Sequence, residues 1–185
     1  MNRMPETIDI TDVRLTEMAA EQMTPVMARS GVSWYQLTLI VQNRSDEPVH
    51  VVTAIRRIRY EADRRLLVVQ LAGPEVPTGS LVVGVPMPPR YRELGARERA
   101  TIIHALSSPI TFLEMTADGT RHPRDVRLSE DVDSIECTLG YETEPPAPVT
   151  DLTAWRTPEP RRGRGNTVTA SWQSLRRGKP NQTSQ

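Results

Sequence analysis

Sixteen prolines and ten glycines interrupt this 185-residue chain so often that long helices are disfavoured along most of it. Proline lacks a backbone donor and clashes with the preceding turn of a helix. The longest stretch without either residue type runs only from Val49 to Ala72. Short alternating or apolar runs, bounded by turn residues, recur instead between Ile8 and Tyr141. This pattern predicts an all-β fold, a two-sheet antiparallel β-sandwich of seven or eight strands.

Apolar residues at two-residue spacing locate the individual strands. The clearest strand is Trp34–Gln42, in which every second residue from Tyr35 to Val41 is apolar. Thr7–Leu15 contains two apolar pairs that are one step out of phase with each other. The other predicted strands are Leu66–Leu71, Leu81–Val85, Ala100–Leu106, Ile110–Met115, Val126–Leu128 and Ile135–Tyr141.

The stretch from Val49 to Leu71 is predicted to be one long hairpin. Its first strand, Val49–Tyr60, changes phase partway along, which indicates a β-bulge. The segment that follows, Gly73–Arg99, is rich in Pro and Gly in its first part and is expected to be irregular. Within it, Tyr91–Arg99 is charged and contains a glycine, which favours a loop, with a short helix as the alternative.

Thr16–Ser30 is the one candidate helix of the chain. Thr16 could cap its start, but Pro25 interrupts the pattern, so a helix and a helical loop both remain open. Met18, Met23 and Met27 lie roughly on one side of the candidate helix and form a methionine stripe. Such a stripe is more often part of a hydrophobic core than the lining of a binding groove.

Composition and charge divide the chain into a body and a tail. Residues 1–144 carry the strand pattern, whereas residues 145–185 are rich in Pro, Arg and Gly and are predicted to be disordered. Residues 152–185 hold seven basic groups and one acid, so their net charge is +6 and that of the remaining chain is −6. The alternating segment 167–176 is the predicted docking element of the tail.

The tail therefore carries the candidate binding residues. An aromatic anchor in a flexible arm can dock onto a protein partner or add a strand to a sheet edge. Arg-Arg-Gly-Arg-Gly could instead contact the phosphates of a nucleic acid, with tryptophans stacking on bases, and the segment could also pack back on its own domain. The predicted partner-binding residues are Trp155, Arg161, Arg162, Arg164, Val168, Trp172, Leu175, Arg176 and Arg177.

The chain carries few groups suited to catalysis. None of the common nucleotide-binding, serine-hydrolase or metal-binding motifs is present, and His50, His104 and His122 are far apart in the sequence. The only cysteine, Cys137, alternates with apolar residues and should be buried and inert. We expect no enzyme and no cofactor, although a catalytic site assembled only by the fold stays an alternative.

An acidic cluster near the end of the body is the best metal candidate. Several carboxylates in one loop suit calcium, but the cluster lacks the glycine and spacing of an EF-hand, and a solvated acidic loop is the preferred interpretation. The residues of the cluster are Glu130, Asp131, Asp133 and Glu136.

A single cysteine and the lack of an apolar leader or membrane-spanning run favour a cytoplasmic protein.

Residues 36–106 resemble immunoglobulin-like sandwich modules of the late-embryogenesis-abundant, water-stress type. The resemblance rests on a strand with an Asn turn (Leu39–Asn43), a Pro-Val strand (Pro48–Ile55), a long hairpin, and a strand after a charged Gly turn (Gly95–Leu106). It implies an immunoglobulin-like sandwich without enzymatic activity.

These observations favour a non-enzymatic interaction or structural module, such as a subunit or accessory of a larger bacterial assembly, with the basic tail anchoring a partner. Edge strands also make a homo-oligomer plausible. The alternatives are a nucleic-acid-associated accessory protein that binds through its Arg/Gly tail and an enzyme of unrecognised type.

Overall fold

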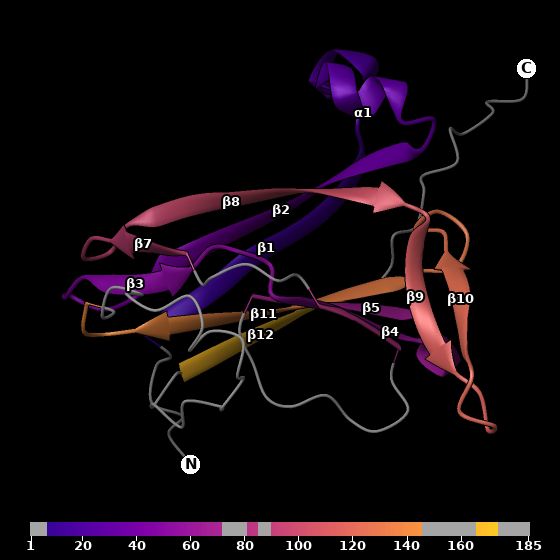
Figure 1. The fold of residues 1–185 in the computed structure, drawn as a ribbon. Coiled ribbons are helices and arrows are strands. Elements are labelled where there is room, and N and C mark those ends of the chain that lie inside the picture. Colours follow the sequence, from indigo (N-terminus) through magenta and orange to yellow (C-terminus); the bar gives the residue numbers. More distant parts are fainter. Residues whose placement is uncertain (1–6, 72–80, 85–89, 146–165, 174–185) are drawn as a thin grey trace, which may run out of the picture.

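The computed structural model of the chain describes residues 7–71, 81–84, 90–145 and 166–173, and of 81–84 and 166–173 it describes the backbone alone. The described residues contain twelve strands, one α-helix and two 3₁₀ turns (Figure 1). The chain is therefore mostly β, as predicted, with more strands than the expected seven or eight. The extra strands come mainly from segments whose sequences carry no alternation long enough to reveal them.

A three-stranded antiparallel sheet forms one layer of the molecule. Its order is β1 (Ile8–Glu17), β2 (Ser33–Asn43) and β8 (Arg99–Ser108). The register between β1 and β2 shifts between Ile10 and Asp12, which explains why the apolar pairs of β1 change phase. Within the described residues β8 pairs only with β2, so its other side is an open edge.

The second layer is a larger sheet. Strand β11 (Ser134–Glu142) is parallel to β5 over five residue pairs, so this sheet is mixed and not purely antiparallel as predicted. Strand β12 (Asn166–Gln173) pairs with the opposite side of β11. The order is β6 (Leu81–Gly84), β4 (Arg57–Glu61), β5 (Leu66–Gln70), β11, β3 (Val49–Val52) and β7 (Tyr91–Leu94).

A hairpin of β9 (Ile110–Met115) and β10 (Arg121–Val126) stands across one end of the molecule (Figure 1). The predicted Asp118-Gly119 turn is confirmed: Gly119 has a φ of +81°, a conformation that glycine adopts without strain. Strand β10 begins five residues before the expected start of its predicted counterpart.

The hydrophobic core lies between the two layers and is built from the predicted alternating positions. Every second side chain of β2, from Tyr35 to Val41, is buried. In β11 the predicted positions from Ile135 to Tyr141 are buried too, together with the intervening Thr138 and Gly140. The hairpin adds Phe112, whose ring centroid lies 6.2 Å from that of Tyr60. The two-residue rhythm of the sequence thus corresponds to one shared core.

Two predictions in the middle of the chain are wrong. Tyr91–Leu94 is strand β7 and not a loop, because its backbone pairs with β3 although two of its four side chains are exposed. Val49–Tyr60 is not one bulged strand, because it breaks between β3 and β4. At the break the N–H of Thr53 donates to Arg90 at 2.7 Å, so the hairpin is limited to β4 and β5.

The candidate helix resolves into a mostly irregular segment. Strand β1 continues through Thr16 to Glu17, a 3₁₀ turn covers Ala20–Gln22, and α1 is only five residues long, Pro25–Arg29. The cap of α1 is Thr24, whose hydroxyl accepts a hydrogen bond from Met27 at 3.3 Å. Proline therefore starts this helix, a position where its missing N–H costs nothing. Of the three methionines only Met18 is buried.

Candidate protein-interaction site

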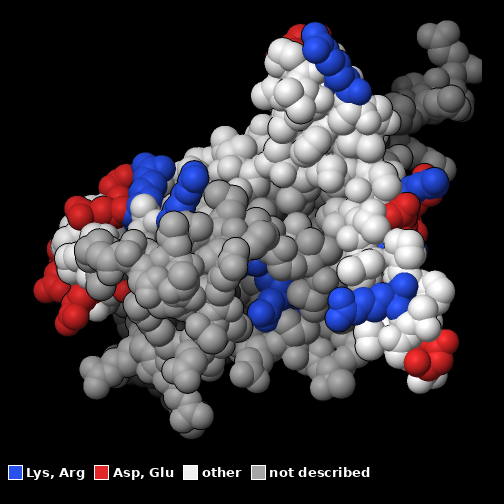
Figure 2. Space-filling model, in the orientation of Figure 1, with Lys and Arg blue, Asp and Glu red and all other residues white. Residues whose placement is uncertain are grey.

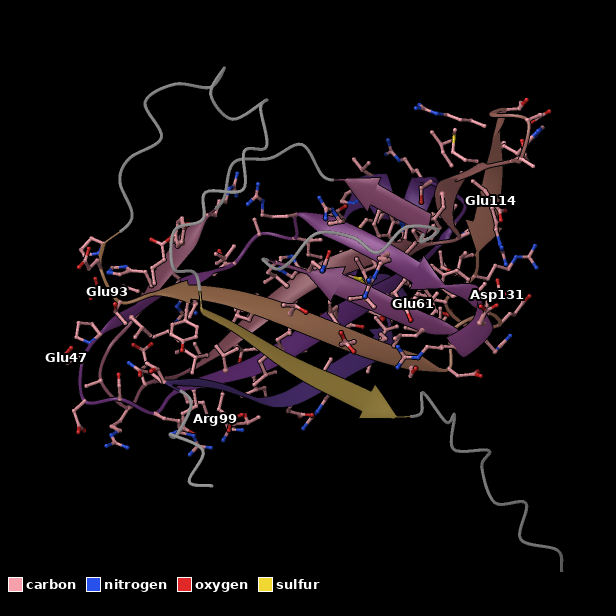
Figure 3. The ribbon with its side chains drawn as sticks, turned by 90° about the horizontal axis from the view of Figure 1, so that it is seen from below. Glu47, Glu61, Glu93, Arg99, Glu114 and Asp131 are labelled. Atoms are coloured by element: carbon pink, nitrogen blue, oxygen red, sulfur yellow. The ribbon has the colours of Figure 1, made fainter. Side chains whose placement is uncertain are left out.

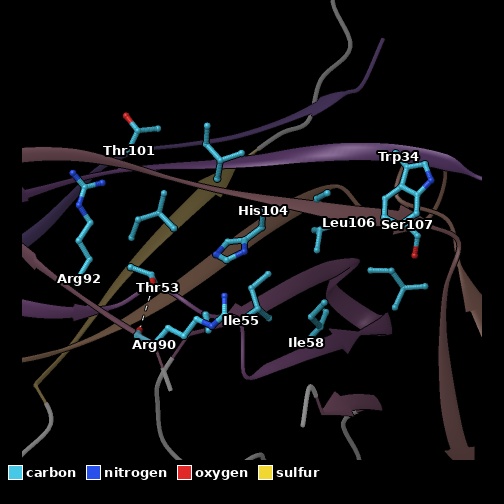
Figure 4. Close-up of a pocket in the computed structure, with 15 residues that line it drawn as sticks. Trp34, Thr53, Ile55, Ile58, Arg90, Arg92, Thr101, His104, Leu106 and Ser107 are labelled. Carbon is cyan, nitrogen blue, oxygen red and sulfur yellow. Dashed lines mark hydrogen bonds between the residues drawn. The ribbon is translucent and has the colours of Figure 1, made fainter. Parts of the chain in front are cut away.

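The open edge of β8 lies beside a groove of about 760 Å³ (Figure 4). One wall of the groove is β8 itself, and the opposite wall is formed by Thr53–Ile55 of the connection between β3 and β4 together with Ile58 of β4. On the other side of the molecule, β12 lies against β1 and pairs with β11. The two layers are therefore bridged on one side by β12 and leave a groove on the other.

The lining of the groove is largely apolar. Successive side chains of β8 point to opposite faces, so Leu106 is buried, while Ile103 remains 58% exposed. An exposed isoleucine beside an open strand edge offers surface that a bound chain could cover. Six apolar residues that line the groove are Trp34, Ile55, Ile58, Ile103, Leu106 and Ile110.

The charged residues that line the groove are both arginines, Arg90 and Arg92. The N–H and the hydroxyl of Thr53 donate to the carbonyl oxygen of Arg90 at 2.7 and 3.2 Å, which ties this rim to the break between β3 and β4 (Figure 4). Arg92 is exposed and pairs with Glu98 at 3.4 Å. Among the described residues that line the groove none is an acid, so its rim favours a ligand that carries carboxylates.

His104 is the titratable residue that points from β8 into the groove (Figure 4). Its Nε2 atom is buried and has no hydrogen-bond partner in the described part of the chain. Burial lowers the pKa of His104, and a backbone hydrogen bond with Thr53 acts in the opposite direction. The folded protein therefore favours the neutral imidazole.

This burial predicts a pH dependence of stability. In the unfolded chain His104 titrates near 6.5, whereas its pKa is lower in the folded chain, so the unfolded state binds more protons between the two values. The free energy of unfolding should thus fall as the pH drops from above 6.5 through the folded pKa. Urea unfolding at pH 7.5 and 5.5 should show a smaller loss for His104→Gln than for the unchanged protein.

His122→Gln is the matched control for this measurement, because His122 is exposed on β10. The free energy of unfolding of the His122→Gln variant should change with pH as much as that of the unchanged protein. Equal losses in the His104→Gln variant and the unchanged protein would contradict the assignment of the effect to His104.

The structure places two of the predicted partner-binding residues in its own sheet. Val168 and Trp172 belong to β12, where they stand opposite Leu139 and Ile135 of β11. The predicted docking segment is thus, in its first part, a strand added to a sheet edge of the same chain. The predicted binding residues outside the described residues are Trp155, Arg161, Arg162, Arg164, Leu175, Arg176 and Arg177.

The acidic cluster Glu130, Asp131, Asp133 and Glu136 is spread over a turn and the strand that follows it. Asp133 accepts a hydrogen bond from Arg65 Nε at 2.7 Å, and Asp131 accepts one from the Arg127 N–H at 2.7 Å. Glu130 pairs with Arg127 at 3.1 Å. Across the described residues, no group of three His, Cys, Asp or Glu side chains is placed to hold a metal ion.

Charged residues concentrate at the ends of the molecule. Glu47, Glu93 and Arg99 lie at one end, and Glu114 and Asp131 lie at the other (Figure 3). Figure 2 shows acids mainly at the ends of one face, with basic side chains also near its middle.

The groups considered for catalysis do not converge. His50 lies on β3, His104 on β8 and His122 on β10. Cys137 is fully buried, as predicted, and burial raises the pKa of its thiol to about 12. A thiol with that pKa is almost entirely protonated near neutral pH and is a poor nucleophile.

Sequence reasoning did not identify the groove. One wall, β8, belongs to the three-stranded sheet, whereas the other, Thr53–Ile58, leads into β4 of the larger sheet, and forty residues lie between the two walls along the chain. Two signals pointed toward it: the phase change before Ile58, which marks the break between β3 and β4, and the apolar residue Ile103 on the face of β8 that is otherwise polar or small.

No model of a known protein family matches this chain, and no curated protein matches its sequence. Among the described residues, none of the helices has the length and apolar character needed to cross a membrane.

Proposed function

We propose that this protein is a non-enzymatic interaction module that binds an extended segment of a partner protein along the open edge of β8. The observation that carries this proposal is the position of a ten-residue edge strand beside an apolar groove with an arginine rim. The partner segment would alternate apolar residues with residues that include Asp or Glu.

The backbone of β8 supplies the general part of this recognition. An edge strand presents unpaired N–H and C=O groups, and an extended peptide that pairs with them continues the sheet. The affinity of such complexes comes mainly from these hydrogen bonds and from apolar surface that leaves water. The exposed side chain of Ile103 and the groove floor around Leu106 would provide that apolar surface.

Selectivity would come from the groove's other groups. Arg90 and Arg92 would pair with carboxylates of the bound segment, and such charge-assisted hydrogen bonds set register and orientation. The neutral state of His104 keeps the interior of the groove free of a buried positive charge. A basic segment would meet Arg90 and Arg92, the latter paired with Glu98, and no acid is among the described residues that line the groove, which disfavours such a segment as a ligand.

A catalytic role receives less support from the same residues. Ser107 also lines the groove, but it is three positions from His104 on β8, so the two side chains project to opposite faces of the strand. A nucleophile and its base must lie within hydrogen-bond reach.

The proposal also includes the type of the sandwich, a role in a larger assembly and a contact made by the tail. The sandwich would be of the immunoglobulin-like, water-stress type, and the module would work as a subunit or accessory of a larger assembly. The arginines of the tail, from Arg156 to Arg177, would add a second contact to a partner. Binding of the full-length chain to RNA at low salt, with a steep loss as salt rises, would favour the nucleic-acid alternative for these arginines.

A peptide selection tests the proposed function. A library of random peptides displayed on phage is selected on the full-length chain, and enriched peptides are synthesised and their affinities measured by fluorescence anisotropy. We expect alternating apolar residues together with Asp or Glu. Ile103→Ser should weaken binding about tenfold or more, because the loss of a central hot-spot contact costs about 2 kcal/mol or more and about 1.4 kcal/mol corresponds to a factor of ten.

Leu113→Ser is the matched control for Ile103→Ser, because Leu113 is an exposed strand residue with a similar exposed fraction, 55% against 58%, and it does not line the groove. Its affinity should stay unchanged. Arg90→Gln should reduce the preference for acidic peptides, whereas Arg121→Gln on β10 should not. If no peptide is enriched, or if enriched peptides bind Ile103→Ser normally, the β8 edge is not the site.

A further inference from the structure

The outer edge of β11 is covered by a strand that comes from far along the chain. Strand β12 pairs with β11 over eight successive residues, from Tyr141 opposite Asn166 to Ser134 opposite Gln173. The other side of β11 is shared by β5 and β3. Without β12, this core strand would expose one whole edge of backbone donors and acceptors.

The connection between β11 and β12 is much longer than the pairing needs. Two antiparallel strands can be joined by a loop of two to five residues, whereas twenty-three residues separate Glu142 from Asn166. A chain of that length can span roughly 75 Å when fully extended. The connection therefore does not require β12 to pair with the β11 of its own chain.

The advantage of pairing within one chain is also limited by this length. Tethering gives a strand an effective concentration of about millimolar when the linker is short, and this value falls as the linker lengthens, so pairing between two copies competes best at high protein concentration. The β11 edge of a second copy offers the same residues in the same register. Exchange of β12 between two copies would keep every β11–β12 hydrogen bond, so only the connection changes.

We propose that β12 is an exchangeable strand and that two copies of this chain assemble by inserting their β12 strands into each other's sheets. The partner is a second copy because each chain supplies both members of the pairing. Charge supports the same partner: residues 152–185 carry +6 and the remaining chain −6, so the tail of one copy is complementary to the body of another. Reciprocal exchange closes a two-fold symmetric dimer.

This proposal uses a different edge from the β8 groove and does not depend on it. Ile103→Ser should leave the exchange unchanged, and loss of the exchange should leave peptide binding in the groove unchanged. Failure of one proposal is therefore distinguishable from failure of the other.

Cys137 makes the exchange directly testable, because it is the only cysteine of the chain and stands opposite Ala170 in the β11–β12 register. Directly opposed positions of antiparallel strands lie at a separation compatible with a disulfide. One chain keeps Cys137 and is otherwise unchanged. The second chain carries Cys137→Ala and Ala170→Cys, and the two are mixed at full length and oxidised.

A disulfide between these two chains forms only when β12 of the second pairs with β11 of the first. We expect this linked species, and we expect its yield to rise with protein concentration. The control replaces Ala170→Cys by Thr169→Cys, whose register position faces Thr138 on the other side of the strand, and should yield no linked species. The mass of the unchanged protein in light scattering should rise above the 20.8 kDa of one chain as concentration increases.

The single variant Ala170→Cys, which retains Cys137, supplies the deciding comparison. An internal disulfide at every concentration, with no linked species in the mixed experiment, would show that β12 stays with its own chain and would overturn the proposal. The absence of both internal and intermolecular disulfides would overturn it as well, because the β11–β12 register itself would then be wrong.

Discussion

Replacing Asn43 with Asp is expected to cost about 3–5 kcal/mol of folding stability. Asn43 is fully buried at the end of β2. Its Nδ2 group donates to the carbonyl oxygens of Glu47 at 2.7 Å, Gly95 at 2.9 Å and Leu94 at 3.3 Å. A carboxylate oxygen in that place would face three acceptors without a proton to share.

The other half of the Asn43 side chain explains why a smaller residue is tolerated better. Its Oδ1 atom accepts from the N–H and the hydroxyl of Ser45 at 2.9 and 2.7 Å. Asn43→Ala leaves these groups unpaired but brings no charge into the core, so we expect a loss of about 1–3 kcal/mol. The difference between the two variants isolates the cost of the charge.

Urea unfolding of Asn43→Asp, Asn43→Ala and the unchanged protein at pH 7 measures these losses. The excess cost of Asp should shrink at low pH, because the surrounding carbonyl oxygens raise the pKa of the introduced carboxyl and its protonated form can donate a hydrogen bond. An Asn43→Asp protein as stable as Asn43→Ala at pH 7 would contradict this account of the site. The two backbone segments that Asn43 contacts, Ser45–Glu47 and Leu94–Gly95, flank the pair of strands β3 and β7.

Phe112→Ala is the second substitution with a large expected effect, about 3–5 kcal/mol. Phe112 is fully buried, and its ring lies 6.2 Å from that of Tyr60 on the larger sheet. It is one of the side chains that attach the β9–β10 hairpin to the core, together with Ile110 and Val126. Its removal leaves a cavity that the neighbouring strands cannot fill by collapse, because they are fixed by backbone pairing.

The control is Leu113→Ala, the next residue of the same strand, whose side chain is 55% exposed and should contribute less than about 0.5 kcal/mol. Unfolding is followed in urea by near-ultraviolet circular dichroism. If Phe112→Ala instead gave a stability within about 1 kcal/mol of the unchanged protein, the hairpin would not be anchored through this ring. A separate early transition would indicate that the hairpin detaches before the sheets unfold.

The sequence was most informative where one strand faces one core. Tyr35 to Val41 in β2 and Ile135 to Tyr141 in β11 alternate because a strand presents successive side chains to opposite faces, and burial of one face demands apolar residues there. The first four residues of Leu66–Gln70 are all apolar, and this run predicted a buried strand because β5 is buried on both faces. The burial of Cys137 followed from the same rhythm.

Elements that depend on their neighbours were not predictable in this way. Tyr91–Leu94 forms a strand because β3 offers it a pairing edge, although its own exposed residues resemble those of a loop. The segment Thr16–Ser30 does not form one helix, because β1 extends to Glu17 and the only α-helix described in this segment is the short one that starts at Pro25. Local propensity is too weak to decide such segments against tertiary pairing.

The alternation of side chains between Ile8 and Tyr141 and the proline spacing dictated the β class and most of the core, because these are local consequences of strand geometry and burial. The β8 groove and the β11–β12 pairing arose only in the folded chain. Each brings together segments that are distant in sequence, and hydrogen bonding between backbones leaves almost no signature in the side chains that a sequence records.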